Sequence, residues 1–134
     1  QTAINYLRAD TDICTSKIGT LGFCLGGKMA YLSATSTDAD ASIGYYGVGI
    51  QDMLEEAGNI AAPLLLHMAG QDEFVPPDAQ AAVHAGLDAH AHVSIFDYPE
   101  QDHGFTREGS MHFDAAATAS AHARSLEALA RALR

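Results

Sequence analysis

Short apolar runs alternate along the chain with stretches in which apolar residues recur at helical spacing. The run PLLLHM, residues 63–68, is typical of a strand that is buried on both faces of a parallel sheet. Similar β-prone runs predict three further strands, at residues 17–23, 41–46 and 93–98. Helical spacing predicts helices at residues 25–33, at about 51–57, from Pro76 onward and at about 113–133.

Two of the predicted helices show a packing face. After the proline pair that suits a first helical turn, apolar residues recur every four positions, at Ala79, Val83 and Leu87. The expected packing stripe of the last helix consists of Leu126, Leu129, Ala130 and Leu133.

This alternation of strands and helices predicts an α/β fold. We expect a mostly parallel sheet of about four strands, flanked by helices and joined by right-handed crossovers. The length of 134 residues predicts a single domain, residues 1–134. Residues 1–9 resemble the end of a longer helix, so the chain is expected to begin within a fold. Active groups are expected at the C-terminal ends of the strands.

Charge and composition narrow the range of partners. Seven Lys and Arg against 17 Asp and Glu give a net charge of -10, which repels nucleic acid and anionic membranes. We find no signal-peptide pattern and no apolar run approaching the roughly 20 residues of a spanning helix. The two cysteines are too few for a disulfide framework, which predicts a reduced, cytoplasmic setting. The seven histidines lack metal-ligand spacing, so neither a metal nor a cofactor is expected.

The segment GFCLGGKM, residues 22–29, fits two motifs. As G-x-x-x-x-G-K it resembles a phosphate-binding loop, but Met29 stands where such a loop needs a hydroxyl for magnesium. As G-x-C-x-G it is a nucleophile turn, with Gly22 and Gly26 as the small residues on either side of Cys24. In that case the Leu25 N–H would contribute to an oxyanion hole. An inert, buried Cys24 remains the alternative.

A nucleophilic Cys24 requires a base to take its proton and an acid to orient that base. Asp72 follows the 63–68 run by four residues, and His103 follows the 93–98 run by five and precedes the last helix. This chain order matches the α/β-hydrolase arrangement. Alternatively, Asp72 is a turn residue and His103 a surface loop residue. The rival acids are Glu73, Asp97 and Asp102.

Four segments together resemble the dienelactone hydrolase family of cysteine hydrolases: GFCLGGKMAY, GYYGVGI, PLLLHMAGQDEFVPP and HGFTR. The resemblance implies a Cys24-His103-Asp72 triad that hydrolyses a small-molecule lactone or enol ester, possibly carboxylated, through an acyl-cysteine. It also implies that Arg107 holds a substrate carboxylate; the alternative is a solvated loop cation. Tyr45 and Tyr46 either line the pocket or pack under the helices.

The chain departs from the family because it corresponds only to the C-terminal portion and lacks the usual N-terminal half. In the family that half supplies a second oxyanion-hole N–H, a glutamate that engages the resting cysteine and another arginine. Without it, the strand at 17–23 becomes a sheet edge with exposed apolar residues. We therefore expect a homodimer or association with another chain. The alternative function is a catalytically silent remnant that serves as an oligomerising or ligand-binding module.

Overall fold

The computed structural model describes residues 1–12, 14 and 17–134, and its strands form one sheet in the order β1-β2-β3-β4. The strands are β1 (Gly19–Phe23), β2 (Ala41–Tyr45), β3 (Leu64–Ala69) and β4 (Val93–Tyr98). All neighbouring pairs are parallel. The predicted parallel sheet is therefore confirmed, with strand ends that differ from the sequence estimate by at most two residues.

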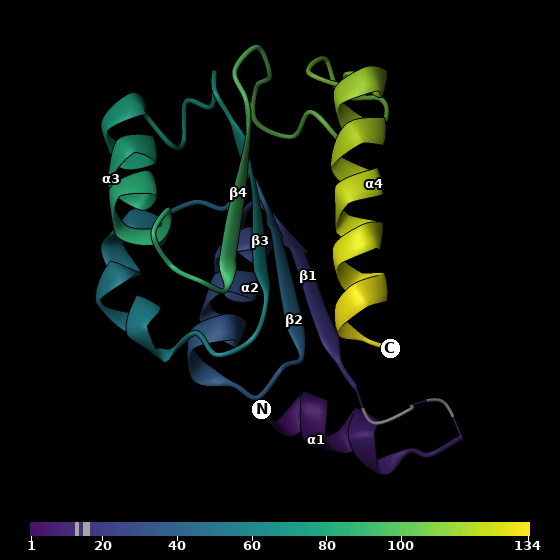
Figure 1. Cartoon of the computed structure of the whole chain (residues 1–134). Coiled ribbons are helices and arrows are strands. Elements are labelled where there is room, and N and C mark those ends of the chain that lie inside the picture. The colour runs from purple at the N-terminus through teal and green to yellow at the C-terminus, as the bar shows by residue number, and fades with distance from the viewer. Residues whose placement is uncertain (13, 15–16) are drawn as a thin grey trace.

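The helices cover both faces of the sheet (Figure 1). They are α1 (Thr2–Ala9), α2 (Leu25–Ser36), the 3-10 segment η1 (Ile50–Asn59), α3 (Pro77–Leu87) and α4 (Ala115–Ala132). In Figure 1, α2, η1 and α3 lie on one side of the sheet and α4 lies on the other. Within the residues that the structure describes, no helix combines the length and apolar character needed to cross a membrane.

Each face of the sheet has its own apolar core. Under α2, η1 and α3, the buried residues of β3 meet the predicted α3 stripe of Ala79, Val83 and Leu87. Under α4, residues of β2, β3 and β4 meet Phe105 and Ala121, both of which are fully buried. Strands β2 and β3 are buried along their whole length because both faces are covered, as the apolar 63–68 run predicts.

The predicted packing stripe of α4 is confirmed only in part: Leu129 packs against the core under this helix, but Leu126 and Ala130 are exposed. The buried residues of this helix are Thr118, Ala121 and Ser125, whereas Leu126 is 67% exposed. The reason is that small and polar residues allow α4 to approach the sheet closely and to reach polar groups on β2 and β3. Leu126 instead lines a groove beside the edge strand β1.

Strand β1 forms one edge of the sheet and carries exposed apolar side chains. Leu21 is 49% exposed and Phe23 is 43% exposed. A groove of about 220 Å³ runs between this strand and α4. It is lined by Leu21, Phe23, Tyr45, His122, Ser125, Leu126 and Leu129. The sheet edge expected from the sequence is therefore present in the structure.

Candidate active site

Three chemically capable side chains follow the C-terminal ends of three strands. Cys24 comes directly after β1, Asp72 after β3 and His103 after β4. The loops that follow β3 and β4 gather at the upper edge of the sheet in Figure 1. Parallel strands bring their C-terminal ends to one edge, so residues far apart in sequence can meet there.

Cys24 lies on a sharp turn between β1 and α2. Its backbone is at φ 57° and ψ -117°, a conformation that costs about 1–3 kcal/mol for a residue with a side chain. Its N–H donates to the Tyr45 carbonyl at 3.0 Å, and its carbonyl accepts from the N–H of Gly27 at 2.9 Å. This strained geometry is the strand-turn-helix arrangement that the nucleophile-turn motif predicts.

The structure shows which glycines make this turn possible. A Cβ at Gly22 would lie 1.9 Å from the carbonyl oxygen of Gly26, so this position tolerates no side chain. A Cβ at Gly26 would meet nothing within 4 Å, so the expectation that the turn excludes a side chain there is wrong. Within α2 the restricted position is Gly27, where a Cβ would lie 2.7 Å from the Gly47 Cα. The crowding thus arises from packing of α2 against the loop after β2.

His103 is held by Asp72. Its Nδ1 lies 2.7 Å from Asp72 Oδ2, and Asp72 is only 4% exposed. The other carboxylate oxygen accepts the N–H of Phe74 at 2.9 Å. Because a carboxylate only accepts, the neutral imidazole donates from Nδ1 and keeps Nε2 free as an acceptor. That is the tautomer a general base requires.

The rival acids have other partners. Asp97 lies 3.0 Å from the Nε2 of His84, and Glu73 is exposed. Asp102 accepts the backbone N–H of His103 at 2.6 Å, and its other oxygen lies 3.4 Å from the Nδ1 of His112. Asp102 therefore holds the backbone of the loop, while Asp72 holds the ring.

Two aromatic rings flank the imidazole of His103. Tyr46 meets it edge-on with ring centroids 5.0 Å apart, and Phe74 does so at 4.9 Å. Phe74 was not among the site residues predicted from the sequence. The available signal was its position two residues after Asp72, where a backbone N–H commonly bonds to an aspartate side chain.

The two tyrosines at the end of β2 occupy different places. Tyr45 is 1% exposed under α4, and its hydroxyl is hydrogen-bonded to Ser125 at 2.6 Å, which corresponds to the packing alternative. Tyr46 lies beside His103, and its hydroxyl is hydrogen-bonded to Thr106 at 2.8 Å. Burial raises the pKa of Tyr46, the bond to Thr106 lowers it, and the charge of a Cys24 thiolate raises it.

Leu25 and Arg107 are the two remaining site residues predicted from the sequence. Leu25 is the first residue of α2, where a helix leaves the backbone N–H without an intrahelical partner. Arg107 is exposed on the loop after His103, and its N–H donates to the Gly104 carbonyl at 2.9 Å. Its charge acts to lower the pKa of Tyr46.

A buried chain of hydrogen bonds supports the sheet beneath α4. Arg124 donates to the Tyr98 hydroxyl at 3.0 Å, and that hydroxyl lies 3.0 Å from His67 Nδ1. The Nε2 of His67 lies 2.9 Å from the Ser125 hydroxyl. Burial, together with the charges of Arg124 and His122, lowers the pKa of His67 to about 4. His67 is therefore a neutral structural group.

No metal cluster accompanies these residues. Within residues 1–12, 14 and 17–134, no group of three or more His, Cys, Asp or Glu side chains is placed to hold a metal ion. The candidate site consists of a strained cysteine, an oriented imidazole and a buried carboxylate.

The family model for the dienelactone hydrolase family matches residues 1–133. The chain belongs to the dienelactone hydrolase family. It is 37% identical over 130 residues to a carboxymethylenebutenolidase of Pseudomonas putida, covering 97% of this chain and 55% of that protein. It is 38% identical over 128 residues to carboxymethylenebutenolidase 1 of Cupriavidus pinatubonensis, covering 96% of this chain and 54% of that protein. The chain thus spans about half the length of the curated relatives it matches.

Solved structures agree on the fold. A putative dienelactone hydrolase from Klebsiella pneumoniae superimposes with a TM-score of 0.74 at 26% identity, over 84% of this chain and 51% of that chain. A dienelactone hydrolase-like promiscuous phosphotriesterase from metagenomic libraries gives a TM-score of 0.82 at 21% identity. That match covers 98% of this chain and 59% of the other. The dienelactone hydrolase-like α/β-hydrolase fold expected from the sequence is therefore confirmed.

Proposed function

We propose that the chain belongs to a cysteine-dependent hydrolase that opens a lactone or enol ester through an acyl-cysteine intermediate. The observation that carries this proposal is the strained turn at Cys24 on the same sheet edge as the 2.7 Å pair of His103 and Asp72. An L-residue is rarely held at φ 57° without a reason, and nucleophile turns are such a reason.

In the acylation step, the Nε2 of His103 takes the proton of the Cys24 thiol, and the sulfur attacks the carbonyl carbon of the substrate. The N–H of Leu25 stabilises the negative oxygen that forms. When the intermediate collapses, the bond to the ring or ester oxygen breaks, and that oxygen takes the proton back from His103. Asp72 keeps the ring oriented and stabilises its charged form.

In the deacylation step, water attacks the thioester carbonyl while His103 takes a proton from it. The carbon–sulfur bond then breaks, the sulfur recovers the proton and the product leaves as an acid. Both steps use the same imidazole, with Nε2 as the proton acceptor in each.

The substrate class follows from the relatives and from Arg107. Two of the matched relatives are named carboxymethylenebutenolidase, a lactone hydrolase that acts on a carboxylated compound. We assign to Arg107 the binding of a substrate carboxylate, which a planar guanidinium can hold with two hydrogen bonds. Because the net charge is -10, this local cation is needed to offset repulsion of an anionic substrate.

The proposal includes a partner for the open sheet edge, either a second copy of the chain or another polypeptide. Exposed Leu21 and Phe23 on β1 support it. Both cysteines are free, which fits a reducing cytoplasmic setting.

A second candidate function is a catalytically silent module that oligomerises or binds a ligand. The observation that favours it is the open edge of the sheet, where Leu21 and Phe23 of β1 are exposed. In that case the triad geometry would persist without turnover.

One experiment distinguishes the two candidate functions. Hydrolysis of a carboxylated dienelactone and of p-nitrophenyl acetate is measured for the chain, for Cys24→Ala and for Cys14→Ala. We expect turnover that Cys24→Ala abolishes and Cys14→Ala retains, since only Cys24 lies on the strained turn. Equal turnover in both variants would exclude the cysteine mechanism, and no turnover in any of the three would favour the silent module.

A further inference from the structure

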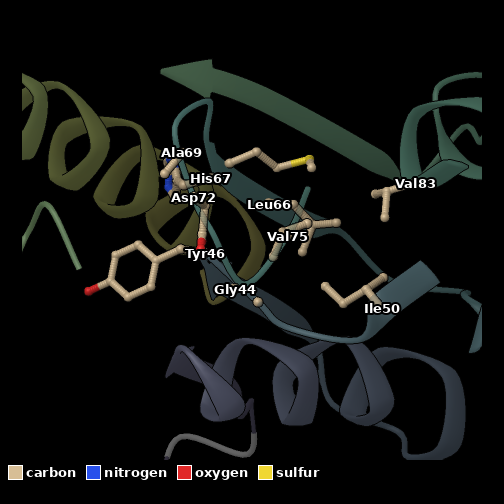
Figure 2. A pocket seen from close by; sticks show the side chains of 11 residues that line it. Gly44, Tyr46, Ile50, Leu66, His67, Ala69, Asp72, Val75 and Val83 are labelled. Atoms are coloured by element: carbon tan, nitrogen blue, oxygen red, sulfur yellow. The ribbon is translucent and has the colours of Figure 1, made fainter. Parts of the chain in front are cut away.

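An enclosed hollow lies directly behind the candidate site, on the side of the sheet covered by α3. Figure 2 shows Tyr46 and Asp72 at one end of it and Ile50 and Val83 at the other. Its lining is otherwise almost entirely apolar. The lining residues are Gly44, Tyr46, Gly47, Ile50, Leu66, His67, Met68, Ala69, Asp72, Val75 and Val83.

The hollow is closed to any organic group in this structure. It leaves only about 10 Å³ of room for the centre of a water molecule. A cavity needs roughly 10–15 Å³ by this measure to hold a single water. An acyl chain therefore cannot enter it while Tyr46 is in place.

Tyr46 stands between the hollow and the reacting groups. In Figure 2 its ring extends from the end of the hollow, away from Leu66 and Val75. The ring meets His103 at 5.0 Å and Phe105 at 5.8 Å, and its hydroxyl is fixed to Thr106. Cys24 packs against the buried cluster that contains Tyr46, and the Cys24 N–H donates to the carbonyl of Tyr45, the residue before Tyr46, at 3.0 Å. Tyr46 is only 5% exposed, so the space it fills is interior space.

We propose that Tyr46 determines the size of the acyl group that Cys24 can carry. Its ring occupies the space into which the acyl chain would extend, and the apolar hollow continues that space beyond the ring. The chain therefore prefers short or compact acyl groups, and loss of the ring opens an apolar pocket for longer linear ones. This inference rests on the proposed function, since it assumes that Cys24 becomes acylated.

The test uses a reaction that needs only the thiol, so it does not depend on hydrolysis. In a Cys14→Ser background, Cys24 is modified with methyl or hexyl methanethiosulfonate; the thiolate forms a disulfide with the alkylthio group and methanesulfinate leaves. The ratio of the hexyl rate to the methyl rate reports the space beside Cys24. We expect Tyr46→Ala to raise this ratio about tenfold, the effect of burying roughly two methylenes.

Two matched variants separate pocket size from looser packing. Tyr46→Phe keeps the ring and loses only the bond to Thr106, so its ratio should stay within about twofold of the parent, far below the tenfold change expected above. Phe74→Ala removes the other ring on His103, but Phe74 is 58% exposed and does not line the hollow, so its ratio should also stay unchanged. An unchanged ratio in Tyr46→Ala, or an equal rise in Phe74→Ala, would overturn the inference.

Folding and function are checked separately. Circular dichroism establishes that Tyr46→Ala is folded, and Tyr46→Leu replaces it otherwise, with a smaller expected rise because leucine fills part of the space. A chain with no esterase activity but the predicted change in ratio would refute the proposed function and leave the assignment of Tyr46 intact. An active chain with an unchanged ratio would refute the assignment of Tyr46 and leave the proposed function intact.

Discussion

His103 contacts two carboxylates, and they act on different parts of the residue. Asp72 binds the ring at Nδ1, whereas Asp102 binds the backbone N–H and lies near His112. Only a carboxylate on the ring can select the tautomer and stabilise the charged imidazole. These contacts support Asp72, rather than Asp102, as the proposed orienting acid.

Replacing Asp72 with asparagine should lower kcat/KM for p-nitrophenyl acetate by about a hundredfold or more, because the amide carries no charge and can hold the wrong tautomer. Initial rates across a range of substrate concentrations provide the measurement. Glu73→Gln, one residue away and exposed, is the matched control and should retain activity. A larger loss of kcat/KM in Asp102→Asn than in Asp72→Asn would show that Asp102, not Asp72, orients His103, and would contradict this prediction.

The chain order of Cys24, Asp72 and His103 was predictable because each follows a strand, and parallel strands bring their ends together. Phe74 was not predictable as a neighbour of the imidazole, since that contact forms between loops that follow different strands. Tyr45 and Tyr46 could not be separated either. Adjacent strand residues face opposite sides, but only the structure shows where β2 ends and the direction of Tyr46 changes, at φ 37°.

At the scale of elements, the candidate nucleophile is placed by the close approach of α2 to the loop after β2. Gly27 packs against Gly47 with no room for a methyl group, and the nearest atoms are backbone atoms that cannot rotate away. The spacing of the motif led to Gly26 instead, because sequence alone shows which residues flank Cys24 but not which helix face meets the neighbouring loop. The packing stripe of α4 could not be fully predicted for the same reason, since the sequence does not show which face of α4 meets the sheet.

Gly27→Ala should lower the free energy of unfolding by about 1–3 kcal/mol, the usual cost of overpacking against a rigid neighbour. Gly26→Ala is the control at the adjacent position. It should be neutral or stabilise by up to about 1 kcal/mol, because alanine favours the helix and the added methyl group meets nothing. Urea denaturation of the two variants measures the difference. Equal stability of the two would contradict the packing that the structure shows.

At the scale of the molecule, the open sheet edge and the net charge have opposite effects on self-association. Strand β1 presents unpaired backbone groups beside the apolar groove under α4, which favours association. The net charge of -10 opposes self-association, and salt screens that repulsion over a distance of about 10 Å at 0.1 M. A dimer formed through this edge should therefore tighten as the salt concentration rises.

A lysine at position 21 tests this surface. Leu21→Lys should shift the chain toward monomer, since a desolvated ammonium in the apolar groove is costly and lysines commonly block sheet edges. Met111→Lys introduces the same charge at a residue that is 92% exposed and lies outside the groove, so it should leave association unchanged. Light scattering over a series of protein and salt concentrations gives the mass of each variant. If the parent chain stays monomeric at micromolar concentration and high salt, the proposal that this edge pairs with a second copy is wrong.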